Sequence, residues 1–120
     1  MQKAILLAPV FLIVASNDYA IAGDLPSCSP PPAPVERVPP EYPMIESPIP
    51  ISGYAMVAFT ISESGKVEDV EILESVSEPT HSGFTRGFGQ SAKRAISQWL
   101  YDPRQQACRS QMMFKFELEE

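Results

Sequence analysis

The sequence predicts a small α+β domain in which two strands, one helix and a third strand follow one another along the chain. Residues 53–73 and 109–118 alternate between apolar and polar side chains, as strands do, and residues 88–100 carry apolar side chains at helical spacing. We expect the helix to cover one face of the first two strands and the last strand to join their sheet. At 120 residues, the chain has room for one such domain and extensions.

The first two strands are predicted to form a hairpin. Four apolar residues alternate with their neighbours on the first strand: Ala55, Val57, Phe59 and Ile61. Residues 62–65 supply turn formers, with Gly65 free to adopt a positive φ, and the second strand places Val70 and Ile72 on one face. A hairpin of two strands is marginally stable alone, so it needs a cover.

The predicted helix spans residues 88–100. Its apolar stripe is formed by Phe88, Ala92, Ala95, Ile96 and Trp99. Gly87 and Gly89 weaken its first turn, and Pro103 ends it. Residues 75–87 are predicted to be a loop, in which His81 is a solvent-exposed residue.

The final predicted strand alternates over residues 109–118, with four apolar residues on one side: Met112, Phe114, Phe116 and Leu118. Because a helix separates it from the hairpin, we expect it to lie at an edge of the sheet, where its main chain has unpaired N–H and C=O groups. Such an edge can accept a peptide as an added strand, or it can pair with a second copy of the chain to form a homodimer.

The N-terminus has the features of a cleavable signal peptide over residues 1–22. Lys3 precedes an apolar run at residues 4–15, and Ala20-Ile21-Ala22 provides a small-x-small cleavage pattern. An uncleaved membrane anchor is the alternative, although the apolar run is shorter than the roughly 20 residues that span a bilayer. The sequence therefore predicts export.

Residues 23–39 are predicted to be a proline-rich arm, and residues 40–120 the globular domain. Ten of the thirteen prolines lie between residues 26 and 50, which favours an extended polyproline II tether in solvent. In an exported chain we favour a disulfide between Cys28 and Cys108, with two free thiols or an intermolecular bridge as alternatives.

Composition and spacing argue against several functions. The net charge of -6 and the lack of a Lys/Arg cluster argue against nucleic acid and anionic lipid as partners. We expect no enzyme activity, cofactor or metal site, because the lone His81 has no partnered nucleophile and the cysteines lack ligand spacing. An acidic set is interpreted as a solvated surface rather than a cation site: Glu68, Asp69, Glu71 and Glu74.

An ordered set of motifs resembles the C-terminal domain of the TonB energy transducers. It comprises Pro40-Glu41-Tyr42-Pro43, residues 53–59 (GYAMVAF), residues 64–70 (SGKVEDV), and a helical stretch that leads to Trp99-Leu100-Tyr101-Asp102-Pro103. The resemblance covers about residues 40–118. It implies a three-stranded antiparallel sheet with one helix on one face. It further implies a periplasmic domain that captures the N-terminal "TonB box" peptide of outer-membrane receptors by strand addition, in support of energy-coupled import of iron chelates, cobalamin or similar solutes.

The resemblance also assigns site residues. The peptide-pairing edge would be Arg109, Gln111, Met112, Met113, Phe114, Lys115 and Phe116, with Glu41, Tyr42 and Pro43 near the bound peptide. Structural roles would belong to Gly53, Gly65, Trp99, Tyr101 and Pro103. Family transducers also carry an N-terminal anchor that meets an inner-membrane motor complex and a longer spacer, so the alternative is a stand-alone secreted or periplasmic adaptor, or receptor blocker, without energy coupling.

Overall fold

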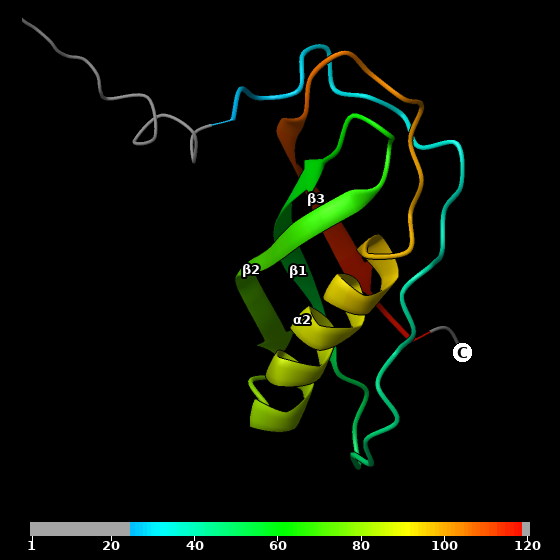
Figure 1. The fold of residues 1–120 in the computed structure, drawn as a ribbon. Coiled ribbons are helices and arrows are strands. Elements are labelled where there is room, and N and C mark those ends of the chain that lie inside the picture. Colours follow the sequence, from blue (N-terminus) through cyan, green and yellow to red (C-terminus); the bar gives the residue numbers. More distant parts are fainter. Residues whose placement is uncertain (1–24, 119–120) are drawn as a thin grey trace, which may run out of the picture.

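The chain forms a two-layer domain in which one helix lies across one face of a three-stranded sheet (Figure 1). The computed structural model describes residues 25–118. Its elements are β1 (Ser52–Ile61), β2 (Val67–Glu78), α2 (Ser82–Ile96) and β3 (Cys108–Phe116). The strands are antiparallel and their spatial order is β2-β1-β3. The predicted order of strand, strand, helix and strand is therefore confirmed, as is the edge position of the last strand.

A tight turn joins β1 and β2, as the sequence predicts. The Gly65 N–H donates to the Ser62 carbonyl at 2.9 Å, and the Ser62 N–H donates to the Lys66 carbonyl at 2.8 Å. Gly65 has a φ of 93°, and a Cβ atom there would lie 2.0 Å from the Tyr101 carbonyl oxygen. Both the backbone conformation and the close approach of residue 101 therefore require glycine.

The core lies between the sheet and the helix. The predicted apolar faces of β1 and the helix are both buried there, and the largest fully buried side chains are Val57, Phe59, Ile61, Phe84, Phe88 and Ile96. Phe88 stacks on Phe116 with ring centroids 4.5 Å apart, which links the middle of α2 to the end of β3. A Cβ atom on Gly53 would lie 2.7 Å from the Phe88 ring, so β1 can pass under this ring only with glycine at that position. Each such aromatic side chain contributes about 1.5–3 kcal/mol by leaving water.

The helix begins earlier and β2 runs longer than the sequence predicts. β2 continues to Glu78 and α2 starts at Ser82, so the predicted loop at residues 75–87 is too long and only residues 79–81 connect the two elements. Its polar side chains bond to one another: the Ser77 hydroxyl lies 2.6 Å from that of Thr85 and accepts from the His81 N–H at 2.9 Å. Gly87 and Gly89 lie inside the helix, where they pack closely against Pro43 and Ile72. Tertiary contacts outweigh the weak helix propensity of glycine at these two positions.

His81 is the N-cap of α2 and not a solvent-exposed loop residue. Its backbone is extended, and its Nδ1 atom accepts a hydrogen bond from the Phe84 N–H at 3.2 Å. The imidazole also lies edge-on to the Phe84 ring, with centroids 5.0 Å apart. The lone histidine thus stabilises the first turn of the helix.

Trp99 lies beyond the helix, which ends at Ile96, but it is buried as predicted. Its ring packs edge-on against Phe114 at 5.6 Å and beside Tyr101 at 6.5 Å. The indole N–H donates to the Val38 carbonyl at 2.8 Å, and the Arg37 guanidinium lies over the ring at 5.4 Å. The structural roles predicted for Trp99 and Tyr101 are consistent with this packing, whereas Pro103 is exposed in the connection to β3.

The proline-rich arm follows the surface of the domain and is not a free tether. A disulfide joins Cys28 to Cys108, as favoured from the sequence. Further along, the Val35 N–H donates to the Leu100 carbonyl at 2.7 Å, and the Leu100 N–H donates to the Glu36 carbonyl at 3.1 Å. The interpretation of this arm as a solvated tether is therefore wrong for residues 26–28 and 35–38, because composition does not reveal contacts between distant segments.

The predicted signal peptide, residues 1–22, lies outside the described residues. Within residues 25–118, no helix is long and apolar enough to cross a membrane.

The cap at His81 predicts different stabilities for two substitutions. His81→Asn keeps a side-chain acceptor for the Phe84 N–H, whereas His81→Ala removes it, and both remove the imidazole ring. In urea titrations, we expect the free energy of unfolding of the alanine variant to be about 1 kcal/mol lower than that of the asparagine variant. Equal stability of the two variants would contradict the capping role.

Candidate functional site

The candidate site is the outer edge of β3. This strand pairs with β1 along one side, and the sheet ends at its other side. The only described main chain that reaches this outer side is a short segment of the arm, where Ser27 forms a parallel bridge to Arg109.

The arm shows which main-chain groups of β3 point outward. The Arg109 N–H donates to the Pro26 carbonyl, and the Cys28 N–H donates to the Arg109 carbonyl, both at 2.8 Å. Successive residues of a strand direct these groups to opposite sides. The outward residues are therefore Arg109, Gln111, Met113 and Lys115. Among the described residues, the last three have no main-chain partner on that side.

The opposite edge of the sheet, on β2, is much less suited to pairing. Its register against β1 shifts twice, between Met56 and Val57 and between Ala58 and Thr60. Asp69 has a φ of 52°, which bends the strand further, and β2 exposes several carboxylates: Glu68, Asp69, Glu71, Glu74 and Glu78. Bulges and charges of this kind protect an edge from strand addition. The nine pairs between β1 and β3 run without interruption, so β3 offers the regular edge.

The Arg109 side chain braces the start of β3 across the open face of the sheet, the face that α2 leaves uncovered. One guanidinium nitrogen donates to the Thr60 hydroxyl at 3.0 Å and to the Asp69 carbonyl at 2.9 Å. Another lies 3.6 Å from the Glu71 carboxylate, a half-exposed pair that contributes less than about 1 kcal/mol. Arg109 therefore connects all three strands.

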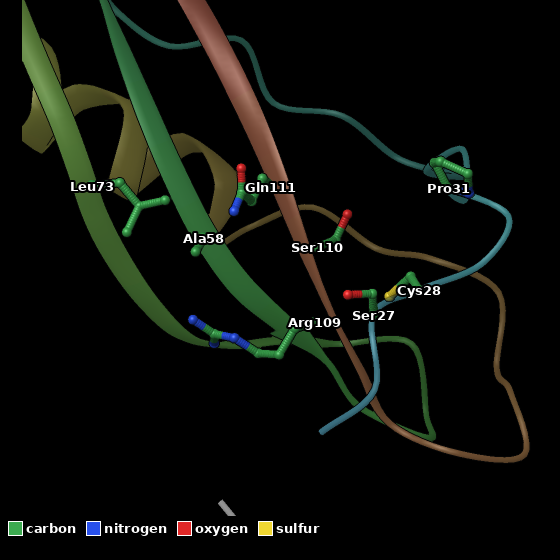
Figure 2. Close-up of a pocket in the computed structure, with 8 residues that line it drawn as sticks. All are labelled: Ser27, Cys28, Pro31, Ala58, Leu73, Arg109, Ser110 and Gln111. Carbon is green, nitrogen blue, oxygen red and sulfur yellow. The ribbon is translucent and has the colours of Figure 1, made fainter. Parts of the chain in front are cut away.

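A groove of about 420 Å³ lies beside β3 at the point where the arm departs from it. Figure 2 shows Ser27 and Cys28 next to the strand, Pro31 farther out, and the Gln111 and Leu73 side chains over the sheet. The groove thus combines arm, sheet face and strand edge. Its lining residues are Ser27, Cys28, Pro31, Ala58, Leu73, Arg109, Ser110 and Gln111.

A second hollow, of about 290 Å³, lies on the open face toward the other end of β3. Tyr54, Met113 and Lys115 contribute to it, and the Met113 side chain is 46% exposed. The Tyr54 hydroxyl donates to the Glu74 carboxylate at 2.9 Å, and this hydrogen bond raises the pKa of Tyr54. An apolar methionine between polar neighbours gives the edge a contact surface for side chains as well as main chain.

The structure divides the predicted edge residues into two groups. Gln111, Met113 and Lys115 have outward main-chain groups, whereas those of Met112, Phe114 and Phe116 point to β1. Phe114 and Phe116 are buried against the helix side of the sheet and hold the strand in place. Arg109 was predicted to belong to the peptide-pairing edge, but in the structure its outward N–H and C=O groups already bond to the arm.

Residues 41–43 lie against the helix. The Glu41 carbonyl accepts from the Ser91 hydroxyl, and Pro43 packs beside Gly87. Tyr42 packs against Phe84 and Phe88 and donates to the Ile51 carbonyl. Proximity of residues 41–43 to a bound peptide stays a prediction.

The sequence did not predict that the proline-rich arm lines this site. Ser27 and Pro31 line the groove although they lie some 80 residues from β3 along the chain. The available signal was the pattern Pro26-Ser27-Cys28-Ser29-Pro30, a cysteine in a short segment bounded by prolines. Within residues 25–118, no group of three or more His, Cys, Asp or Glu side chains could hold a metal ion.

The fold and the site define a small α+β domain with one regular strand edge open to its surroundings. The family described as Gram-negative bacterial TonB protein C-terminal matches residues 38–118 of this chain, more than half of it. The chain therefore belongs to that family, and the resemblance seen in the sequence is confirmed.

Two comparisons agree with this assignment. Protein TonB of Pseudomonas aeruginosa strain PAO1 is 32% identical over 71 residues, which cover 59% of this chain and 19% of that protein. The chain thus spans about a fifth of the length of this curated relative. The solution NMR structure of the Pseudomonas aeruginosa TonB C-terminal domain matches with a TM-score of 0.61 and 28% identity, covering 81% of this chain and 97% of the other.

The geometry predicts an alternating pattern of amide exchange along β3 in the ligand-free protein. The Gln111, Met113 and Lys115 amides should exchange with solvent at least about tenfold faster than those of Met112 and Phe114, which bond to β1. Hydrogen exchange followed by NMR measures each amide separately. Uniform protection along residues 111–115 would contradict an open edge.

Proposed function

We propose that this protein captures an extended peptide by adding it as a fourth strand to the outer edge of β3. The observation that carries the proposal is the run of outward main-chain groups at Gln111, Met113 and Lys115, on a strand whose other side is paired without interruption. Main-chain pairing supplies affinity in such complexes, and neighbouring side chains supply selectivity. The partner is the N-terminal TonB box peptide of an outer-membrane receptor.

The wider role follows from membership of the TonB family. The captured receptor peptide would couple the protein to energy-dependent import across the outer membrane, with an inner-membrane motor complex as a further partner. Family membership supports this role over that of a stand-alone adaptor or receptor blocker. The location is the periplasm, after removal of residues 1–22, and the disulfide between Cys28 and Cys108 supports an oxidising compartment.

A pair of substitutions at Met113 separates main-chain from side-chain recognition. Met113→Pro removes an outward N–H while leaving the ladder to β1 intact, which an edge strand tolerates. Titration with synthetic peptides of receptor N-termini from the same bacterium should show at least about tenfold weaker binding. Met113→Ala retains the N–H and should bind more tightly than the proline variant.

Urea unfolding provides the control for these variants, since Met113→Pro must remain folded for its binding to be interpreted. Met112→Pro removes an N–H that bonds to β1, so it should destabilise the domain much more than Met113→Pro. Equal peptide affinity of the wild-type and Met113→Pro proteins, or no binding across the receptor peptides, would contradict strand addition at this edge.

The location makes a separate prediction. Intact-mass measurement of the protein from the periplasmic fraction of its host should give a chain that lacks residues 1–22 and contains no thiol that reacts before reduction. Recovery of the chain with Met1 in the membrane fraction would contradict cleavage and favour an anchored transducer.

A further inference from the structure

The arm segment 26–30 is built to pair with β3 at one residue only. The Pro26 carbonyl accepts from the Arg109 N–H and the Cys28 N–H donates to the Arg109 carbonyl, both on the outer side of β3, which is a parallel bridge at the single pair Ser27 and Arg109. Continuing that ladder toward Gln111 would need an N–H at residue 30, and continuing it the other way would need one at residue 26. Both positions are proline and have no N–H, so the pairing ends on both sides.

One residue of strand pairing is too little to hold a segment in place in water, because ordering the backbone costs about 1–2 kcal/mol per residue. The disulfide supplies the missing attachment, since it joins Cys28 to Cys108, the residue directly before Arg109. This covalent link keeps the segment at a high effective concentration beside Arg109. A peptide arriving from solution therefore competes poorly for the outward groups of Arg109.

The groove beside Ser110 and Gln111 opens directly after this segment, where the arm turns away from the strand (Figure 2). A peptide strand paired with Gln111, Met113 and Lys115 would run in line with residues 26–28, and its near end would lie in the groove. At the other end of β3, Glu117 and Leu118 are exposed, and no other segment within residues 25–118 bonds to the outer edge there. The candidate site is thus closed at one end and open at the other.

We propose that residues 26–30, held by the Cys28–Cys108 disulfide, are an end stop that fixes the register of the bound peptide. This inference rests on the proposed strand addition and specifies where along β3 the added strand ends. The peptide pairs with Gln111, Met113 and Lys115, it ends against Cys28, and it extends only past Lys115 toward Leu118. The stop makes the ligand an extended peptide with a defined end position, and it prevents sliding along the edge.

The test uses the full oxidised protein and two nested series of synthetic receptor N-terminal peptides, one lengthened at each end, with affinity measured by calorimetry. In the wild-type protein, lengthening toward Leu118 should tighten binding, whereas lengthening toward Cys28 should change affinity less than about twofold. In the Cys28→Ser/Cys108→Ser protein, lengthening toward Cys28 should gain about tenfold, because the two outward groups of Arg109 become available. Ser29→Ala, which keeps the disulfide and both prolines, is the matched control and should behave as wild type.

Affinity that rises at both ends in the oxidised wild-type protein would overturn the end stop, and this result does not depend on whether the serine variant folds. Hydrogen exchange of the ligand-free protein gives a second readout that needs no peptide. The Arg109 amide should be protected at least about tenfold relative to that of Gln111 in the oxidised protein. Equal exchange of these two amides would also overturn the proposal. Protection of Arg109 without binding of any peptide would instead contradict the proposed function while leaving the arm contact intact.

Discussion

The structure depends on the way β1 holds β3 along one side, while the outer groups of Gln111, Met113 and Lys115 stay unpaired among the described residues. Its inward main-chain groups bond to β1 over nine unbroken pairs, and Phe114 and Phe116 anchor it in the core beneath Trp99 and Phe88. These contacts fix the strand without using its outer main-chain groups. An edge that is rigid and still unpaired loses little conformational entropy when it accepts another strand, which is the general advantage of a preorganised site.

The disulfide-linked arm stabilises the domain and shapes the candidate site. A domain of this size buries a modest core, and a covalent link that closes a loop of some 80 residues adds roughly 4 kcal/mol on the chain-entropy model. The same link brings residues 26–28 to the start of β3, while Arg37 and Val38 cover Trp99 at the end of the helix. The Cys28–Cys108 disulfide therefore contributes both to the stability of the domain and to the shape of the candidate site.

Much of the fold could be predicted because its elements have clear periodicity. The alternation at Ala55, Val57, Phe59 and Ile61 and the helical stripe around Phe88 both reflect burial on one face, and both are confirmed. The boundaries near His81 could not be predicted, since the serines and threonines there satisfy one another only after β2 and α2 come together.

The candidate site could be predicted only in part, because its details depend on contacts between segments that are distant in sequence. The edge position of β3 follows from element order, but the division of its residues into outward and inward groups depends on the register with β1. The occupation of Arg109 depends on an arm segment distant in sequence. Prolines at positions 26 and 30 indicate where pairing must stop, yet nothing local indicates which strand they lie beside.

Strand addition at β3 is tested most directly by the pattern of amide protection when a receptor N-terminal peptide binds the isotope-labelled protein. We predict that the Gln111, Met113 and Lys115 amides become protected together, that the peptide amides facing them do so as well, and that the amides of β2 are unchanged. Protection that appears on β2 or along α2, with these three amides still exchanging freely, would contradict it.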